Sequence, residues 1–178
     1  AGRVAAFEVV RKAFNLGKNH LTERGITISL NDLDVEQEVV DMSEEIIKKA
    51  EEKAREIIGA YADGTLEIIQ GKTAEESREI KILKVLNEIR TKIGEIVKKE
   101  FPEDNPVTYM IRSGGGGNIL NITQMACCVG QQDLEGRRID IGYNNRTLSF
   151  FKEKSLSPRA KGFIRSSFIK GLQPDEFF

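Results

Sequence analysis

Two stretches decide the fold: DVEQEVVDMSEEIIKKAEEKAREIIGAYA, residues 34–62, and TAEESREIKILKVLNEIRTKIGEIVKKE, residues 73–100. In each stretch apolar residues recur every three or four positions, which is the period of an α-helix, and charged residues fill the positions between them. The first apolar stripe consists of Val35, Val39, Met42, Ile46, Ala50, Ala54, Ile57 and Tyr61, and the second of Ile82, Leu86, Ile89, Ile93 and Ile96. Each stripe predicts one long helix with a single narrow buried face.

The residues at the ends of these stretches predict where the helices begin and end. Asp32 or Asp34 can cap the first helix, and Asp63-Gly64 can end it. Thr73 and Glu76 have the spacing of a capping box at the start of the second helix. Because a connection of about ten residues joins the helices, we expect an antiparallel hairpin whose seam is formed by the two stripes.

Shorter elements flank the predicted hairpin. Residues 3–24 have helical spacing, whereas ITISLNDLD, residues 26–34, alternates apolar and polar and predicts a short extended piece. A helix entered through glycines is expected over 118–130, and a second one over 157–171, capped by a serine and begun by a proline. QPDEFF, residues 173–178, has the composition of a helix start, from which we expect the chain to be a fragment of a longer polypeptide.

Together these elements predict a mainly α fold. We expect a long antiparallel helical hairpin on a small base of short helices, loops and a few short strands. The stretch RRIDIGYNNRTLSFF, residues 137–151, is typical of a loop with short extended pieces, and Asn144-Asn145 is a turn signal within it.

The composition narrows the class of protein. Of the 178 residues, 31% are charged and 39% are hydrophobic, a charge content typical of long solvated helix faces. No run of about eighteen apolar residues occurs, so no membrane span is expected, and the first residues lack the pattern of a signal peptide.

The net charge of −1 conceals a segregation along the chain. Residues 34–100 carry 17 acidic and 12 basic side chains, a net charge of −5, whereas residues 108–178 carry 6 acidic and 10 basic ones, a net charge of +4. Solvated faces are the ordinary explanation. The alternative is that the C-terminal third faces something anionic.

Cysteine and histidine are scarce. Cys127 and Cys128 are the only cysteines, and adjacent cysteines do not easily reach a relaxed disulfide geometry, so we expect a reduced, intracellular setting. With His20 as the only histidine, a four-ligand zinc site from this chain alone is not expected. Both cysteines are interpreted as small core residues.

The glycine-rich stretch RSGGGGNILNITQMACCVGQQ, residues 112–132, fits none of the common catalytic motifs. No Gly-Lys-Ser/Thr follows the glycines, as a phosphate-binding loop requires, and their spacing is not that of a dinucleotide fingerprint. No nucleophile elbow accompanies the single histidine. The residues by themselves therefore indicate a helical intracellular chain with a glycine loop near a basic region.

The order of distinctive residues in the C-terminal part is more informative. Residues 108–178 resemble the largest subunit of multisubunit DNA-dependent RNA polymerases in its archaeal and eukaryotic form, whereas residues 1–107 resemble it only in architecture. The shared blocks are Asn121-Ile122-Thr123-Gln124-Met125, Cys128-Val129-Gly130-Gln131-Gln132, Glu135-Gly136-Arg137-Arg138-Ile139, Arg146-Thr147-Leu148, Gly162-Phe163 and Gly171-Leu172-Gln173-Pro174-Asp175-Glu176-Phe177-Phe178.

The resemblance implies a place within a nucleotidyltransferase that copies a DNA template into RNA. Residues 1–107 would be the funnel region with its helical hairpin, about 34–62 and 73–100, and residues 108–178 the pore region leading toward the bridge helix. This region of the family is the proposed route for NTP entry, receives the 3′ end of backtracked RNA and admits transcript-cleavage factors. Other polymerase subunits would be its partners, and no membrane is implied.

The resemblance also implies what this chain lacks. The family's aspartate motif, N-A-D-F-D-G-D, does not occur in the sequence, so the fragment is expected to hold no cofactor and to be inactive alone. Mg²⁺ and Zn²⁺ would be bound elsewhere in the whole polymerase. The lysine-, glutamate- and isoleucine-rich helices are typical of a thermophile and favour an archaeal, cytoplasmic protein; a eukaryotic one would be nuclear.

Eight residues are candidates for contact with NTPs or for lining the pore: Arg112, Ser113, Gly116, Gln124, Gln131, Gln132, Arg137 and Arg138. The family usually reads S-G-A-R-G-S over residues 113–118, and its basic residue contacts the NTP triphosphate. Gly116 stands at that position here, so this contact does not carry over. Arg112 either compensates for it or points away.

Simpler roles remain open for the other candidates. The three glutamines can satisfy buried loop backbone, and Arg137 and Arg138 can pair with local carboxylates. Two alternatives to a polymerase part also remain. One is a stand-alone helical-hairpin interaction module without catalysis. The other is an independent phosphate-binding enzyme. Such an enzyme would bind nucleotide as the isolated chain, and we expect no such binding.

Overall fold

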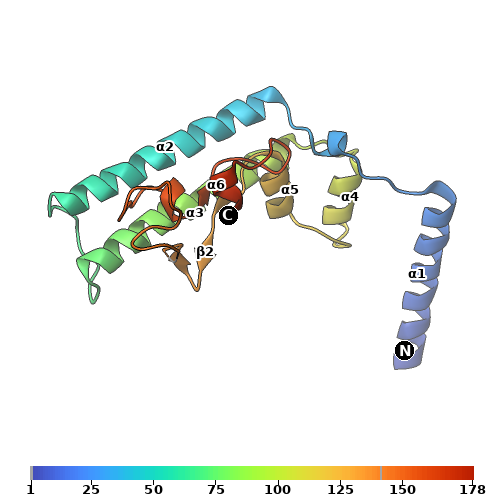
Figure 1. Ribbon diagram of the computed structural model, residues 1–178. Coiled ribbons are helices and arrows are strands. Elements are labelled where there is room, and N and C mark those ends of the chain that lie inside the picture. The colour runs from blue at the N-terminus through green and yellow to red at the C-terminus, as the bar shows by residue number, and fades with distance from the viewer. Residues whose placement is uncertain (1, 141) are drawn as a thin grey trace.

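The computed structural model describes residues 2–140 and 142–178 and confirms a mainly α fold (Figure 1). The helices are α1 (Arg3–Arg24), α2 (Gln37–Ala62), α3 (Ala74–Glu100), α4 (Pro106–Arg112), α5 (Ile119–Ala126) and α6 (Pro174–Phe177), with 3-10 turns η1 (Leu30–Leu33) and η2 (Arg159–Lys161). The strands have two residues each: β1 (Gly130–Gln131), β2 (Asp133–Leu134), β3 (Arg137–Arg138) and β4 (Phe163–Ile164). None of these helices combines the length and apolar character that crossing a membrane requires.

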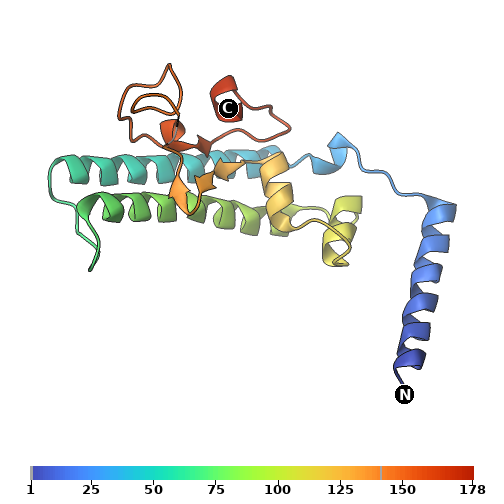
Figure 2. The ribbon, with the colours of Figure 1, turned by 60° about the horizontal axis from the view of Figure 1, so that its bottom comes forward.

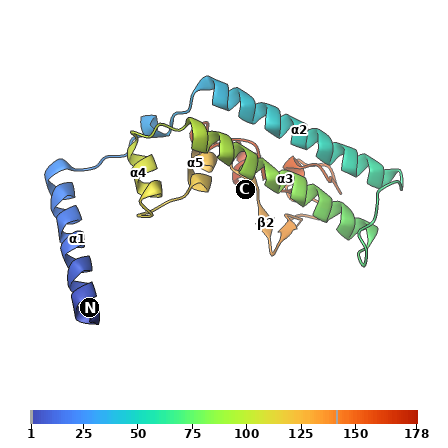
Figure 3. The same cartoon turned by 180° about the vertical axis from the view of Figure 1, so that it is seen from behind.

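Helices α2 and α3 form the predicted antiparallel hairpin, and they run side by side in all three ribbon views (Figures 1–3). The apolar stripes meet at the seam, where Ala54, Ile82, Leu86 and Ile93 are fully buried. Burial of one such leucine or isoleucine side chain contributes about 1.5–3 kcal/mol, so the seam is the main source of stability in this half of the molecule. The prediction of the hairpin is confirmed.

The predicted cap of α3 is confirmed, whereas the predicted cap of α2 is wrong. At the start of α3, Thr73 Oγ1 accepts the Glu76 N–H at 3.2 Å while the Glu76 carboxylate accepts the Thr73 N–H at 3.0 Å. Helix α2 instead begins after Glu36, which makes no side-chain cap. The carboxylate of Asp32 is occupied elsewhere, because it accepts the Ser29 N–H at 2.6 Å and so starts η1.

The extended piece expected over residues 26–34 does not form a strand. Residues 30–33 make a 3-10 turn that buries Leu33 in the core, and the turn contacts α4 and α5. The Asn105 side-chain amide fixes this turn by donating to the Asp32 carbonyl at 2.8 Å. A contact over 73 residues of sequence therefore overrides the local alternation of apolar and polar residues.

The prediction of a helix over residues 157–171 is wrong. Its cap exists, since Ser157 Oγ accepts the Ala160 N–H at 3.3 Å, but η2 ends at Gly162, whose φ is +84°. The chain then enters β4, which pairs antiparallel with β1 and buries Phe163 to 2% exposure. Pairing with a distant strand thus replaces the helix that the local pattern predicts.

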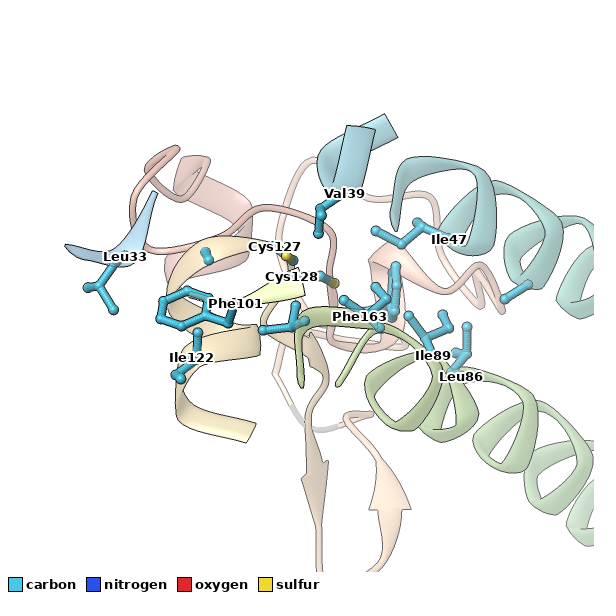
Figure 4. Packing of buried hydrophobic residues seen from close by; sticks show 14 of the residues in the cluster. Leu33, Val39, Ile47, Leu86, Ile89, Phe101, Ile122, Cys127, Cys128 and Phe163 are labelled. Atoms are coloured by element: carbon cyan, nitrogen blue, oxygen red, sulfur yellow. The ribbon is translucent and has the colours of Figure 1, made fainter. Parts of the chain in front are cut away.

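The base packs along one side of the hairpin, whereas α1 stands away from it (Figure 2). Helix α5 lies against α3, and Phe101, Ile122, Cys127, Cys128 and Phe163 extend the hairpin core into the base (Figure 4). Helix α1 has no buried residue.

At the C-terminus, α6 begins at Pro174 as predicted, and the Glu176 carboxylate accepts the Gln173 N–H at 3.0 Å.

Candidate functional site

The glycine run forms a closed turn between α4 and α5. The N–H groups of Gly115 and Gly116 donate to the carbonyl of Met110 at 3.1 and 3.3 Å, which satisfies the C-terminus of α4. Gly114 and Gly117 have φ of +72° and +71°, a region that side chains disfavour, so glycine is required at both positions. The turn is therefore a defined connection and not a slack linker.

Gly116 itself is open to substitution. A Cβ built there would lie 3.6 Å from Met110 Cε, an ordinary van der Waals distance, and its φ is not positive. Arg112, which we considered as a replacement for the family's basic residue, donates to Glu103 at 2.9 Å in an exposed ion pair. Ser113 Oγ donates to the Met110 carbonyl at 3.1 Å. The cationic side chain nearest to Gly116 in the sequence, Arg112, is therefore already paired with a carboxylate.

The three candidate glutamines hold loop backbone. Gln131 is 2% exposed, and its Nε2 donates to the carbonyls of Gln132 and Lys161 at 2.6 and 2.7 Å. The side-chain amides of Gln124 and Gln132 lie 3.5 and 3.4 Å from the carbonyls of Val129 and Gly130. These contacts match the simpler role considered for them. Gln131 Oε1 is buried without a hydrogen-bond partner among the described residues.

Arg138 forms the most buried ion pair that the structure describes. Its side chain has 0% exposure and donates Nε and Nη2 to the two carboxylate oxygens of Glu79 at 2.9 and 3.0 Å. Burial opposes ionisation of Glu79, but the hydrogen bonds and charge of Arg138 outweigh it, so the pKa of Glu79 lies below its ordinary value. Arg138 thus pairs with a local carboxylate, while Arg137 is exposed.

The candidates are spread along α3 and do not converge on one pocket. Arg138 contacts Glu79 near the start of α3, Gly130 lies against Arg90 in its middle, and Arg112 pairs with Glu103 just beyond its end. Because a helix rises 1.5 Å per residue, Glu79 and Glu100 are about 30 Å apart along the axis. In Figure 3 the base lies along α3. The arrangement is a track and not a compact site.

The thiols show no sign of catalytic activation. Burial raises the pKa of Cys127, and it raises the pKa of Cys128 to about 12, so both stay protonated at neutral pH. Cys128 Sγ lies 3.2 Å from the Ile164 carbonyl and helps to hold β4. Within the described residues no three histidine, cysteine or acidic side chains are grouped as metal ligands would be.

Sequence reasoning missed the partners on α3. Glu79 continues the spacing of Ile82, Leu86 and Ile89, so a charged residue stands in register with the apolar stripe. That position signals a buried partner, which is Arg138. Gly130 carried a weaker signal: a Cβ there would lie 2.8 Å from Arg90 Cγ, so only glycine allows this approach of the base to α3.

The architecture and the charges together define a class: an acidic helical hairpin with a small basic base packed along one side. Residues 58–164 match the family model for RNA polymerase Rpb1, domain 4, and the chain belongs to this family. The resemblance to the largest subunit of DNA-dependent RNA polymerases is therefore confirmed.

Three relatives extend the similarity beyond the C-terminal part. DNA-directed RNA polymerase subunit Rpo1N of Halobacterium salinarum is 38% identical over 177 residues, covering 99% of this chain and 18% of the relative. Subunit Rpo1N of Methanocaldococcus jannaschii is 46% identical over 155 residues, which cover 87% of this chain and 12% of the relative. Subunit Rpo1N of Methanothermobacter thermautotrophicus is 40% identical over 178 residues, which cover 99% of this chain and 20% of the relative. The chain thus spans a fifth or less of the length of these relatives.

Proposed function

We propose that this chain forms the funnel and pore of an archaeal DNA-directed RNA polymerase largest subunit. In this role the hairpin of α2 and α3 is the wall of the funnel, and the base, residues 108–178, lines the inner route that NTPs and the 3′ end of backtracked RNA use. The membership of residues 58–164 in the Rpb1 domain 4 family carries the proposal. The polymerase names of the archaeal relatives support it and favour a cytoplasmic location.

The distribution of charge agrees with such a route. The hairpin, residues 34–100, has a net charge of −5 and the base a net charge of +4. NTPs and RNA ends are polyanions, and a positive wall raises their local concentration. The candidate residues extend over about 30 Å along α3. A channel wall needs such an extended arrangement, whereas a single substrate pocket needs a compact one.

Chemistry is assigned to other parts of the polymerase. The described residues contain no group of three metal-ligating side chains, and the chain has no N-A-D-F-D-G-D motif. In this proposal the Mg²⁺ and Zn²⁺ of the whole polymerase are bound outside this chain. The contribution of this chain is access and positioning. A transcript-cleavage factor with a basic surface is the partner that the acidic hairpin would accept.

Co-purification tests the proposal. An antibody raised against residues 34–100 is used to recover the native protein from source cells, and the second-largest polymerase subunit is expected in the eluate. A stand-alone hairpin module would be recovered without it, which is the alternative reading. A second readout locates the route: in backtracked complexes, an RNA with a photoreactive 3′ end is expected to crosslink within residues 108–178. Crosslinks confined to other segments would remove the pore assignment.

A further inference from the structure

A cavity of about 400 Å³ lies beside the start of α3, away from the glycine turn. Its walls come from α3, from the loop of residues 145–156 and from η2, which gather near the end of the hairpin where α2 joins α3 (Figure 2). Its charged lining residues are Arg78, Arg146, Lys152, Lys154 and Lys161 against Glu75 and Asp140, an excess of three positive charges. Four of these cations contribute to the net positive charge of the base, but the proposed role in transcription gives none of them an individual contact.

The two arginines are held in place by the fold. The Arg78 guanidinium lies 4.3 Å from the centroid of the Tyr61 ring and pairs with Glu79 at 2.9 Å. Arg146 donates Nη1 to the Ser149 carbonyl at 3.1 Å, while its Nε is buried and has no acceptor among the described residues. Arg146 also pairs with Glu153 at 3.5 Å, so each arginine is held in position by a carboxylate that is not part of the cavity lining.

The lysines have no carboxylate partner in the parts of the chain described. Lys152, Lys154 and Lys161 form no ion pair there, unlike Lys170, which reaches Glu44 at 3.0 Å. Burial lowers the pKa of Lys161; Asp140 and Glu79 oppose this, and Arg138 and Arg78 add to it. Burial is the main cause of this shift, and a bound anion would offset the cost of keeping the half-buried ammonium group charged.

The rim of the cavity is fixed by hydrogen bonds. The Lys154 N–H donates to the Asn145 carbonyl at 2.7 Å, and Thr147 Oγ1 donates to the Ala160 carbonyl at 2.7 Å. Asn145 and Lys154 both have positive φ, 55° and 57°, so the loop makes two tight reversals that bring its ends together. The cations are therefore presented on a preformed concave surface, which lowers the entropic cost of binding.

We propose that this cavity is a binding site for a small oligophosphate, of the size and charge of a nucleoside triphosphate. Its volume is in the range of small-molecule sites, and arginine and lysine together are the side chains that recognise phosphate. The lining is net positive, as a site for a polyanion requires, and its three lysines have no carboxylate partner among the described residues. Convergence from three elements onto a concavity favours a compact anion over an acidic protein segment, which needs an extended surface. The site lies largely in the base that the proposed function assigns to the NTP route, but it is argued from this geometry, and its test does not require a role in transcription.

Lysine footprinting on the intact native protein tests the site. An amine-acylating reagent is applied with and without tripolyphosphate or ATP, and modification of each lysine is followed by peptide mass spectrometry. Both anions are expected to slow acylation of Lys152, Lys154 and Lys161 at least severalfold and to leave Lys18, on the exposed helix α1, unchanged. Equal protection assigns recognition to the phosphates, whereas stronger protection by ATP adds the nucleoside.

A matched pair of variants sharpens the test. Lys152→Gln/Lys154→Gln removes two exposed cations of the cavity, and Lys12→Gln/Lys18→Gln removes two exposed cations of α1. The concentration of tripolyphosphate that half-protects Lys161 is expected to rise roughly tenfold in the first variant and to stay the same in the second. Protection that is absent, or equal at Lys18, overturns the proposal. Cavity lysines that are unreactive before any anion is added also overturn it, because another chain then covers the cavity.

Discussion

The hairpin and the base are stabilised in different ways. The seam of α2 and α3 is a periodic row of apolar side chains, and local helical spacing determines which residues of each helix lie in it. The base has two-residue strands and is held by side chains that bond to distant backbone or charge, such as Asn105 to Asp32, Gln131 to Lys161 and Arg138 to Glu79. One region depends on apolar burial and the other on polar groups being satisfied, so they should respond differently to mutation and pH.

The largest expected effect is on the seam. Leu86→Ala removes a fully buried side chain and leaves a cavity, so the free energy of unfolding should fall by about 3 kcal/mol. Chemical denaturation followed by circular dichroism measures it. Lys84→Ala, an exposed change on the same helix, is the control and should shift the value by less than about 0.5 kcal/mol. Equal effects for the two variants would contradict a seam based on apolar burial.

A smaller effect is expected where the hairpin meets the base. Glu79→Gln leaves the buried Arg138 guanidinium without its counter-charge, which should cost about 2 kcal/mol, a value discounted because Glu79 is one-third exposed. The double variant Glu79→Met/Arg138→Met should recover part of this loss, because the Arg138 charge is then no longer buried, while Arg78 keeps its contact with the Tyr61 ring. The exposed pair partner Glu88 provides a control as Glu88→Gln. A double variant less stable than Glu79→Gln would show that packing, and not charge, dominates here.

The helix cap ranks next. Thr73→Ala removes the acceptor for the Glu76 N–H at the start of α3 and should lower the free energy of unfolding by about 1 kcal/mol. Thr73→Ser keeps the hydroxyl and should restore most of that stability. Hydrogen exchange of the Glu76 amide reports the local effect, and exchange that is unchanged in Thr73→Ala would exclude the capping role.

Acid should weaken the junction with the base before the seam. The pKa of Glu79 is lower in the folded chain than its ordinary value of 4.5, so its contribution is fully present above about pH 4.5 and is lost as the pH falls through the folded value. Glu176, despite its burial, is shifted in the same direction by backbone hydrogen bonds from Gln173, Ser166 and Arg165. Denaturation midpoints between pH 6 and 3 should fall less steeply for Glu79→Gln than for the unaltered chain. Parallel profiles would remove Glu79 from this account.

The smallest effect on stability is expected at the glycine turn. Gly116→Arg meets no close contact, so folding should change by less than about 0.5 kcal/mol. In the whole polymerase the added charge should lower the apparent KM for NTP about threefold, as an exposed charge pair allows. Gly116→Gln, uncharged and of moderate length, is the matched control. An apparent KM that does not change in Gly116→Arg would count against triphosphate contact at this turn.

The same contrast explains how far the sequence predicts the structure. Ala50, Ala54, Leu86 and Ile93 lie on the expected stripes because a helix needs only local information, and the Thr73 cap is local too. The short apolar run around Phe163 fits a helix or a strand equally well on its own. Its partner is Gln131, 32 positions earlier, and no local pattern records that pairing.

The candidate site was predictable to a lesser degree. The sequence identified Arg138, Gln131 and Gly116 as notable but left their partners open, because Glu79 lies 59 residues from Arg138. The cations of the cavity were missed entirely. Arg78 belongs to a helix face and Lys161 to a turn, so only the folded chain brings them together.

The pairing of β1 with β4 also has a consequence for how the chain acquires its structure. The two helices of the hairpin form from local hydrogen bonds and are joined by a short connection, whereas β1 with β4, Glu79 with Arg138 and Asn105 with Asp32 each join separate elements across 30 to more than 70 residues. Contacts of low sequence separation form fastest. The hairpin also leaves the ribosome before the base, so it becomes the template on which the base is assembled. A ribosome stalled soon after α3 has emerged would therefore present a finished hairpin still waiting for its base.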